Sequence, residues 1–354
     1  MEHKKKIAVF GGGSTGLTAA GYFGRQGFET ALCDTESYAP VMDAVREKGG
    51  VTLTGMETGF GPVATVTHDP AEALSGASLI FICVTANRHE EIARWIAPWL
   101  EDDQHILISP GNLGCFLFDR VFREMGITRD VTISVLEGNL FPCRLRENAT
   151  VLVGLPFGKK RIAAYPSADT GRAIQAFRPA AEFLPARNAF DCAVNFTNFV
   201  VHIPSTVLSA TAAEKTGYGF NIYESGITDG VLSCAEKLEE ERETLAKAMG
   251  LEAMPGPLKL MQDIAEYEKH PYLECFHQLE GPDGIHHRYY TEDTLCNGAF
   301  LLSVADALGV DMPLLRSFVT VTSAMLCFNF RSHGRTLASL GFADQTFSEI
   351  MERI

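Results

Sequence analysis

The chain has 354 residues and is poor in positive charge: 30 lysines and arginines stand against 44 aspartates and glutamates, so the formal net charge is −14. A nucleic-acid partner requires a basic face, and this balance argues against one. The chain also lacks an internal repeat, a low-complexity segment and an apolar run long enough to cross a bilayer, so no membrane partner is expected. Its length predicts two globular domains of about 150–200 residues.

The nine cysteines include no C-x-x-C pair, and their number is odd. Because they are scattered and several lie in apolar runs, they predict reduced, mostly buried thiols and argue against a disulfide framework or a zinc site. The histidines within residues 277–287 match no ligand spacing, so no metal is expected. Residues 4–6 are lysines before an apolar run, but that run breaks at three glycines. We therefore predict no targeting segment and expect a cytoplasmic protein.

A glycine-rich turn, residues 11–16, is the most informative segment of the sequence. An apolar run at residues 7–10 precedes it, a helical pattern follows it, and a second apolar run, residues 28–33, ends at Asp34. A strand, a glycine turn, a helix, a strand and an acid in this order are typical of the βαβ unit that binds a dinucleotide. We therefore predict an N-terminal α/β domain of the Rossmann type; the alternative is a glycine-rich turn without a ligand.

The three glycines of the pattern have different tasks in such a turn. Gly11 permits the tight turn, Gly13 lets the backbone approach the pyrophosphate, and Gly16 lets the helix pack closely on the strand. Ser14 and Thr15 lie within the turn, and the helix that follows offers its first N–H groups and its positive dipole end to the phosphates. All five residues are assigned to the cofactor site.

Asp34 determines which cofactor is expected. It lies 18 residues after Gly16, at the end of the second predicted strand. A carboxylate there accepts hydrogen bonds from the adenosine ribose hydroxyls and repels a 2′-phosphate. We therefore predict NAD(H), with NADP(H) less favoured. The alternative is that Asp34 only caps the helix that follows it.

Two further apolar runs end in polar loops, and ligands of open parallel sheets collect at such strand ends. The run 79–84 is followed directly by Thr85, and the run 106–109 leads into a loop that contains Asn112. We assign Val84, Thr85 and Asn112 to the cofactor site as well.

Shorter segments make up the rest of the α/β part. Residues 52–67 are rich in threonine and glycine and predict a hairpin or an irregular insert. The runs 150–154 and 161–165 are expected to complete the sheet, and the basic residues 159–161 to form a solvated loop. We place the NAD-binding domain at residues 1–186.

From there the pattern changes to long helices, so residues 187–354 are predicted to form an all-α substrate and catalytic domain. Apolar residues recur at helical spacing over 231–249, with acids between them that we expect to form a solvated face. These acids are Glu239, Glu240, Glu241 and Glu243. Two apolar helices are expected at 297–308 and 312–328, and their apolar positions serve either the core or a homodimer interface.

Three residues of the second half could carry chemistry. His202 lies just before a proline and an apolar helix, and histidine is the usual acid–base group near neutral pH. Asp293 could orient such a histidine as a triad aspartate does. Arg288 could clamp a carboxylate with two hydrogen bonds. The alternative is a core histidine, a helix-capping acid and a surface arginine.

Motifs along nearly the whole chain resemble the opine dehydrogenase family, whose members make octopine, nopaline and N-(1-carboxyethyl) amino acids. These motifs are the glycine turn, Asn198-x-x-x-His202, Tyr223-Glu224-Ser225-Gly226-Ile227-Thr228, the segment from Arg288 to Asp293, and Gly334-Arg335-Thr336-Leu337. Each motif is weak alone, but together they occur in order and at family-like spacing.

The resemblance implies that the amine of an L-amino acid and the carbonyl of a 2-keto acid, often pyruvate, form an imine that NAD(P)H reduces. A histidine–aspartate pair carries the acid–base work in the family, and it matches His202 and Asp293. A family arginine that holds the keto-acid carboxylate matches Arg288, and a glutamate that meets the amino acid matches Glu137. The residues assigned to substrate binding are Arg288, Glu137, Asn198 and Cys143.

The sequence departs from the family pattern in two places. One residue separates His202 from the proline that relatives carry next to their histidine, and Gly138 and Asn139 stand where relatives carry threonine or serine. The second departure leaves the choice of amino acid open. Two other functions compete with this interpretation. One is a 2-keto-acid or ketopantoate-type reductase; such enzymes typically rely on a lysine of the second domain, whereas the matching region here offers His202 and Lys215 lies in a plainer context. The other is an NAD-binding sensor without turnover.

Overall fold

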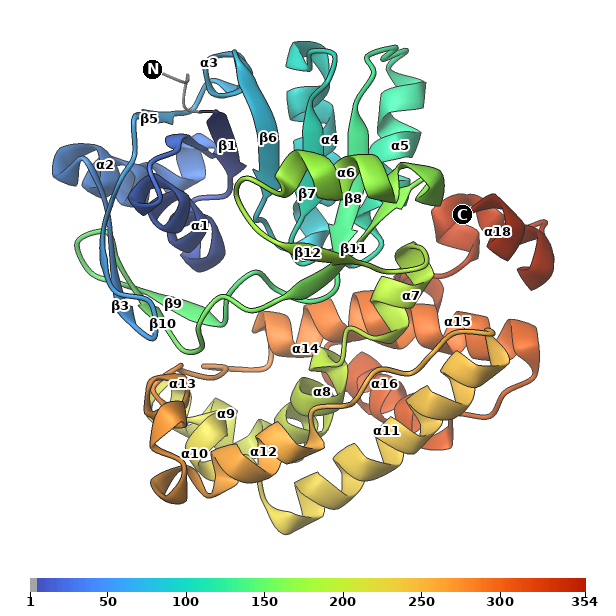
Figure 1. Cartoon of the computed structure of the whole chain (residues 1–354). Helices are drawn as coiled ribbons and strands as arrows, with labels where there is room; N and C mark the ends of the chain where they lie inside the picture. The colour runs from blue at the N-terminus through green and yellow to red at the C-terminus, as the bar shows by residue number, and fades with distance from the viewer. Residues whose placement is uncertain (1–4) are drawn as a thin grey trace. The chain divides into compact units, whose positions relative to one another are not determined.

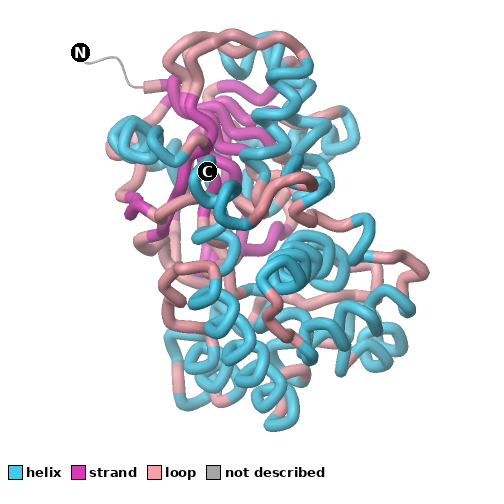
Figure 2. The backbone as a smooth tube through the Cα atoms, turned by 90° about the vertical axis from the view of Figure 1, so that its right-hand side faces the viewer, coloured by secondary structure: helices cyan, strands magenta, loops and turns pink. Residues whose placement is uncertain are grey.

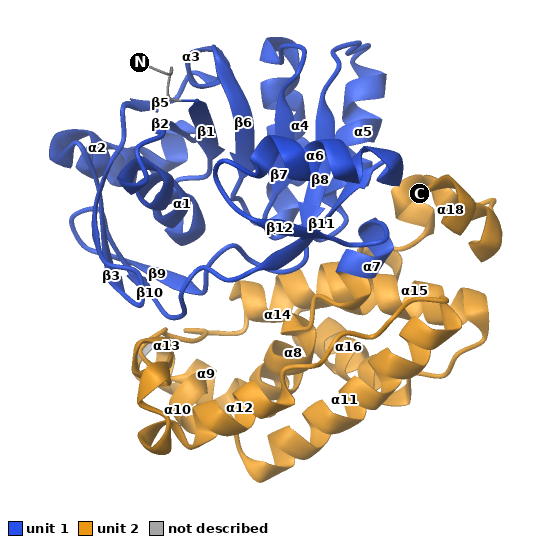
Figure 3. Cartoon of the chain, viewed as in Figure 1, with its two compact units in different colours: residues 1–192 blue, residues 193–354 orange. Residues whose placement is uncertain are grey.

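The computed structural model describes residues 5–354, so the first of the three N-terminal lysines lies outside it. The chain divides into two compact units, residues 1–192 and 193–354 (Figure 3). Every strand of the described residues belongs to the first unit, and the second unit is helical (Figure 2). The predicted order of an α/β domain and then an all-α domain is confirmed. The domain boundary after residue 186 stays a prediction.

An eight-stranded sheet forms the centre of the first unit (Figure 1). Its strands are β1 (Lys6–Phe10), β2 (Glu29–Cys33), β5 (Thr65–Thr67), β6 (Ala77–Ile82), β7 (His105–Ile108), β8 (Thr132–Leu136), β11 (Lys160–Tyr165) and β12 (Phe183–Pro185). The order is β12-β11-β8-β7-β6-β1-β2-β5, and only the β8–β11 pair is antiparallel. The chain thus builds outward from β1 on both sides, so the switch point where such sheets bind ligands lies at the carboxyl ends of β1 and β6.

Helices connect these strands, and one more helix follows the last strand. They are α1 (Ser14–Arg25), α2 (Ala39–Lys48), α3 (Pro70–Leu74), α4 (His89–Ile96), α5 (Gly114–Glu124), α6 (Thr170–Phe177) and α7 (Ala189–Val194). α3 begins where it does because the Asp69 carboxylate accepts a hydrogen bond from the Ala71 N–H (2.9 Å), which caps the helix. The central strands are buried on both faces; Ile106, Leu107 and Ile108 of β7 have no exposed surface. This burial explains their continuous apolar sequence.

One run that was expected to complete this sheet belongs instead to a second sheet. That sheet contains β3 (Gly50–Gly55), β4 (Gly59–Pro62), β9 (Cys143–Arg146) and β10 (Thr150–Val153), in the order β4-β3-β10-β9. β10 pairs with β3 in parallel, Val151 opposite Leu53, and a pairing between segments so far apart leaves no local signal in the sequence. α1 packs on the small sheet so closely that a Cβ on Gly24 would lie 2.0 Å from the Pro62 carbonyl oxygen.

The second unit contains the remaining helices. They are α8 (Asn198–Leu208), α9 (Ala210–Thr216), α10 (Ile222–Ser225), α11 (Asp229–Ala248), α12 (Leu258–Ala265), α13 (Glu274–His277), α14 (Arg288–Asp293), α15 (Ala299–Leu308), α16 (Pro313–Met325), α17 (Phe330–His333) and α18 (Phe347–Arg353). A π-helix, Thr294–Gly298, joins α14 to α15 and widens the helical turn after Asp293. No single helix within the described residues is long and apolar enough to cross a membrane, although α16 and Phe330–Phe342 pass that test as a pair bent by 100°.

The predicted solvated face of α11 is wrong for two of its four glutamates. Glu239 is 5% exposed, and its Oε2 lies 3.0 Å from Nε of Arg242, whose side chain is fully buried. Glu241 accepts hydrogen bonds from two backbone N–H groups at the start of α16, at 2.7 and 3.0 Å. The other two glutamates are exposed. Helical periodicity could not show the contacts of Glu241, because its partners belong to another helix. For Glu239 it could not show that its helical neighbour Arg242 is buried against Asn195 and the Met254 carbonyl oxygen.

Replacing Glu241 by alanine is expected to lower the free energy of unfolding by about 1 kcal/mol, because two N–H groups at the start of α16 lose their acceptor. Denaturant unfolding measures this difference. Glu240→Ala is the matched control, since Glu240 is exposed and pairs with the exposed Lys237 (2.7 Å); a change below about 0.5 kcal/mol is expected there. Equal losses in the two variants would contradict the capping role of Glu241.

Candidate functional site

The glycine turn joins β1 to α1 and leaves the start of the helix open. Gly13 is the N-cap of α1, and among residues 5–354 no side chain caps the helix there. A Cβ on Gly13 would have no atom within 4 Å, whereas one on Gly11 would lie 2.3 Å from the Cys83 carbonyl oxygen and one on Gly16 would lie 1.8 Å from the Gly11 carbonyl oxygen. Gly11 also has a φ of +133°, which L side chains rarely adopt. Backbone packing therefore requires two of the glycines, and the third faces open space.

The first residues of α1 also hold the small sheet. Ser14 Oγ accepts a hydrogen bond from the Leu145 N–H in β9 (2.9 Å). The buried Cys143 Sγ, at the start of the same strand, lies 4.0 Å from Thr15 Oγ1. The structure therefore brings Cys143, assigned to substrate binding, next to Ser14 and Thr15, assigned to the cofactor. These roles stay predictions.

Asp34 directly follows β2 beside the glycine turn, but its carboxylate is already engaged. It is 1% exposed and accepts hydrogen bonds from the backbone N–H groups of Gly12 (2.6 Å) and Thr35 (2.7 Å). Arg88 also pairs with it, Nη2 lying 2.8 Å from Oδ1. Sequence reasoning missed Arg88, although it lies only three residues after Thr85. Its partner is 54 residues away, so only the sheet, which places β2 and β6 on either side of β1, shows the contact.

The remaining predicted cofactor residues follow β6 and β7. Val84 and Thr85 follow β6 after one intervening residue, Cys83, and Thr85 precedes the short 3-10 helix Ala86–Arg88. Asn112 lies in the loop after β7, where it is buried and has a φ of +41°. Because β1, β6 and β7 are parallel neighbours, these loops and the glycine turn share one edge of the sheet.

Glu137 follows β8 at the same edge and pairs with Arg161. Glu137 Oε2 lies 3.0 Å from Arg161 Nη1, and Arg161 Nη2 hydrogen-bonds Asp191. The expectation of a solvated loop at residues 159–161 is therefore wrong for Arg161, whose side chain is 16% exposed within β11. Burial lowers the pKa of the neighbouring Lys160. A run of basic residues predicts a solvated loop when only the sequence is known. In the structure, the carboxylates of Glu137 and Asp191 balance the charge of Arg161.

His202 and Asp293 form a buried pair between two helices of the second unit. His202 lies in α8 and Asp293 ends α14; they are 6% and 7% exposed. His202 Nδ1 lies 2.9 Å from Asp293 Oδ2. Since an ionised carboxylate can only accept, Nδ1 carries the proton of this bond, and Nε2 is the ring nitrogen left to exchange protons. The structure thus joins two residues that lie 91 positions apart.

Three tyrosines that were not assigned to the site from sequence hold this pair in place. The Tyr289 ring stacks on the His202 imidazole with 3.7 Å between ring centroids, and its hydroxyl lies 2.9 Å from that of Tyr223. Tyr290 donates a hydrogen bond to the Thr206 carbonyl oxygen (2.8 Å), which ties α14 to α8. Burial raises the pKa of Tyr290 to about 12, so its hydroxyl keeps the proton it donates.

The extra residue after His202 leaves Pro204 inside α8, yet the helix continues to Leu208. A proline within a helix removes one N–H donor. Two neighbouring hydroxyl groups donate hydrogen bonds to carbonyl oxygens of the previous turn. Ser205 Oγ donates to the Val201 carbonyl oxygen (2.6 Å), and Thr206 Oγ1 donates to the His202 carbonyl oxygen (2.7 Å). The backbone around His202 is therefore helical despite the departure from the family pattern.

The other predicted substrate residues begin the same two helices. Asn198 opens α8 one turn before His202 and is half-buried. Arg288 opens α14, with its side chain 33% exposed, and its Nη1 lies 3.4 Å from Glu292 Oε2. A carboxylate that binds Arg288 would therefore compete with Glu292, a neighbour that sequence reasoning did not consider.

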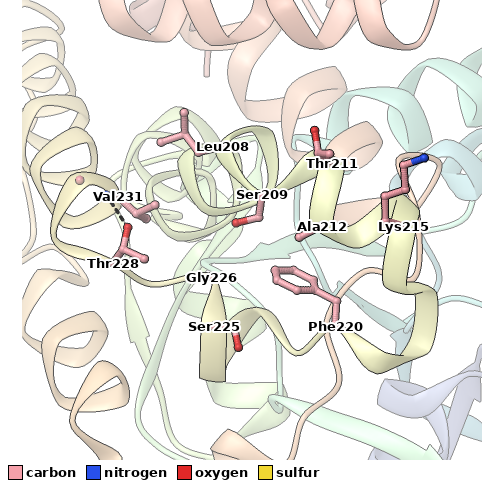
Figure 4. A pocket seen from close by; sticks show the side chains of 11 residues that line it. Leu208, Ser209, Thr211, Ala212, Lys215, Phe220, Ser225, Gly226, Thr228 and Val231 are labelled. Carbon is pink, nitrogen blue, oxygen red and sulfur yellow. Dashed lines mark hydrogen bonds between the residues drawn. The ribbon is translucent and has the colours of Figure 1, made fainter.

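Lys215 belongs to a different part of the second unit. It is exposed and lines an open groove of about 750 Å³ between the ends of α8 and α9, α10 and the start of α11 (Figure 4). No residue predicted to be catalytic or to bind substrate lines this groove. Within residues 5–354, no three His, Cys, Asp or Glu side chains are grouped to hold a metal ion.

Comparison with known proteins finds relatives of both units. The family model of the NAD/NADP octopine/nopaline dehydrogenase alpha-helical domain matches residues 185–326, and that of ketopantoate reductase PanE/ApbA matches residues 7–109. The opine dehydrogenase of Arthrobacter sp. (strain 1C) is 28% identical over 100% of both chains. Protein ocs of Agrobacterium tumefaciens (strain Ach5) is 25% identical over 99% of each chain.

Solved structures of the same fold include octopine dehydrogenase with NADH and pyruvate, which has a TM-score of 0.71 at 17% identity over 99% of each chain. Yersinopine dehydrogenase with NADP⁺ has a TM-score of 0.65 at 15% identity, over 100% of this chain and 99% of that one. These two structures share the fold of this chain. The full-length relatives and the family model of the helical domain point to the same family. The chain belongs to the opine dehydrogenase family and is an oxidoreductase of that type.

Proposed function

We propose that the chain condenses an L-amino acid with a 2-keto acid, pyruvate being the first candidate, and reduces the product with NADH; the reverse oxidation uses NAD⁺. The amine nitrogen attacks the keto carbon, water leaves, and a hydride reaches the imine carbon to give a secondary amine. The observation that carries this proposal is the His202–Asp293 pair, set in the helical unit that matches the octopine/nopaline model. Octopine dehydrogenase itself has been solved with pyruvate, with L-arginine and with agmatine.

His202 Nε2 exchanges protons with the substrate in this proposal. Formation of the carbinolamine and its loss of water each move a proton, and imidazole suits such transfers near neutral pH. Asp293 holds the Nδ1 proton, fixes the tautomer and stabilises the positive charge that the ring gains when Nε2 is protonated. Arg288 binds the keto-acid carboxylate in place of Glu292, and Glu137 meets the amino acid.

The glycine turn fits the pyrophosphate of a dinucleotide. The open space at Gly13 gives room for it, and the uncapped N–H groups of α1 supply donors. When bound, NADH supplies the hydride for the imine carbon. We place NAD(H) before NADP(H), because Asp34 directly follows β2, where the ribose hydroxyls would bind.

The test is NADH oxidation by the purified chain across a matrix of amino acids and 2-keto acids. The expected result is turnover only when both substrates are present. Turnover with a keto acid alone would instead favour a 2-keto-acid reductase, a candidate supported by the ketopantoate reductase match at residues 7–109. That match covers only residues 7–109 of the first unit, where the dinucleotide is proposed to bind. A match confined to a dinucleotide-binding fold says little about the substrate. Absence of turnover with every pair would overturn the proposal.

Tyr289 acts through His202 in this scheme, so it is a positioning residue. Tyr289→Leu is expected to lower kcat about tenfold, because the imidazole loses the ring stacked on it. Tyr289→Phe keeps the ring and loses only the contact with the Tyr223 hydroxyl, so kcat should return to within about threefold of the wild type. Steady-state kinetics with the best substrate pair measure both, and the KM for NADH should stay unchanged. Equal losses of kcat in the two variants would show that the stacked ring is not what supports His202.

A further inference from the structure

Arg88 lies over the carboxylate that the proposed function places at the adenosine ribose. Its Nη2 and Nη1 lie 2.8 and 3.3 Å from the two oxygens of Asp34, and its side chain is 15% exposed while that of Asp34 is 1% exposed. A cofactor that approaches Asp34 therefore meets the guanidinium first. The carbon of that guanidinium lies 5.5 Å from the centre of the Tyr38 ring, which limits its position further.

We propose that Arg88 is a specificity-determining residue of the cofactor site: it binds the 2′-phosphate of NADPH, so that the chain accepts NADPH as well as NADH. The inference rests on the dinucleotide site of the proposed function, but not on its amino-acid and keto-acid substrates. NADH and NADPH differ only in this phosphate, so one side chain can change their relative affinity.

The distances place Arg88 within reach of that phosphate. A ribose 2′-hydroxyl bonded to Asp34 lies about 2.7 Å from a carboxylate oxygen. Since Arg88 Nη2 is itself 2.8 Å from Oδ1, the ribose oxygen lies within about 5.5 Å of the guanidinium when it bonds Oδ1. A phosphate on that oxygen brings its own oxygens closer still. Arginine binds phosphate with two parallel hydrogen bonds, which makes it the side chain best suited to this group.

Asp34 can lose Arg88 without being left unpaired. Its carboxylate keeps the hydrogen bonds from the N–H groups of Gly12 and Thr35, one on each oxygen. Movement of Arg88 to a phosphate therefore exchanges one charged partner for another and does not strand a buried carboxylate. The same movement uncovers Asp34 for the ribose hydroxyls when NADH binds.

Glu91 affects how strongly the chain prefers NADH over NADPH. Its carboxylate lies 3.1 Å from Arg88 Nη2 and 3.5 Å from Nε, and it is 54% exposed. Burial acts to lower the pKa of Arg88, but hydrogen bonds to Asp34 and Glu91 outweigh it and raise the pKa above its ordinary value. A 2′-phosphate must therefore compete with two carboxylates for one guanidinium. This competition keeps NADH favoured while NADPH remains usable.

The experiment measures dissociation constants of NADH and NADPH by fluorescence titration of the full chain, without amino acid or keto acid. Arg88→Leu is expected to raise the ratio of the NADPH constant to the NADH constant at least tenfold. Glu91→Gln is expected to lower the same ratio about threefold or more, because one competitor loses its charge. Arg94→Leu is the matched control: Arg94 lies on α4, is 45% exposed, and pairs with Glu90 and Glu124, so the ratio should not change.

A structural role for Arg88 would weaken both cofactors alike and leave the ratio constant, which would overturn the proposal. So would a ratio that falls in Arg88→Leu, or a wild-type chain whose NADPH binding is undetectable. If Arg88→Leu does not fold, Arg88→Lys and Glu91→Gln decide the question through the same ratio. Failure of the proposed function is distinguishable, because it would appear as absent turnover with every substrate pair while the cofactor titrations still respond.

Discussion

Replacement of His202 by alanine is expected to lower kcat at least about a thousandfold and to leave the dissociation constant of NADH within about threefold. The imidazole is 6% exposed, and Asp293 holds its Nδ1 at 2.9 Å, so Nε2 is the atom that can exchange protons with a substrate. The residues proposed for the pyrophosphate and the ribose belong to the other unit. Loss of the imidazole should therefore remove the chemistry and spare the cofactor.

Steady-state kinetics with the best amino-acid and keto-acid pair test this prediction, together with NADH titration and a melting curve. Asp293→Asn should lower kcat by a smaller factor, because the ring remains while its tautomer is no longer fixed by a charged acceptor. His333→Ala is the matched control, since His333 is an exposed histidine of the same unit whose ring contacts the nearby Ser332, Asn329 and Phe328. A kcat within tenfold of the wild type in His202→Ala would exclude His202 as the acid–base group.

Two glycine substitutions in the turn are expected to affect different properties: one weakens NADH binding and the other destabilises the fold. Gly13→Ala should fold like the wild type, because its Cβ meets no atom within 4 Å and its φ of −88° suits alanine. It should nevertheless weaken NADH binding by a factor on the order of a hundred, because the methyl group takes the space proposed for the pyrophosphate. Gly16→Ala should destabilise the fold, because its Cβ would lie 1.8 Å from the Gly11 carbonyl oxygen and the backbone would have to move.

Thermal unfolding and NADH titration of the two variants separate these effects. Gly126→Ala is unsuitable as a control, because its φ of +67° strains any side chain. Gly171→Ala is suitable, since Gly171 lies in α6 with open space around it and belongs to no predicted site. Normal NADH affinity in Gly13→Ala would remove the pyrophosphate from this turn. Normal stability in Gly16→Ala would contradict the close packing of α1 on the turn.

Local patterns were sufficient for the order of the elements and for the fold class. The period of the apolar residues separates the strands of the first unit from the helices of the second, and glycines at fixed offsets mark the turn. The same reasoning was wrong about residues 150–154 and about Glu239, Glu241 and Arg161. In three cases the deciding partner lies elsewhere in the chain: β10 adds to β3, the start of α16 engages Glu241, and Glu137 engages Arg161. Glu239 pairs with Arg242 of its own helix, and that arginine is held in turn by Asn195 and by the Met254 carbonyl oxygen.

The sequence by itself determined that the chain begins with a dinucleotide-type βαβ unit, continues into a helical half and carries the histidine, the aspartate and the arginine of a family pattern. Only the tertiary structure decided which atoms these residues meet. It joined His202 to Asp293, stacked Tyr289 on His202 and covered Asp34 with Arg88. The physical reason is that turns and helix faces depend on neighbours along the chain, whereas hydrogen bonds, ion pairs and ring stacking depend on distances that exist only after strands and helices have packed.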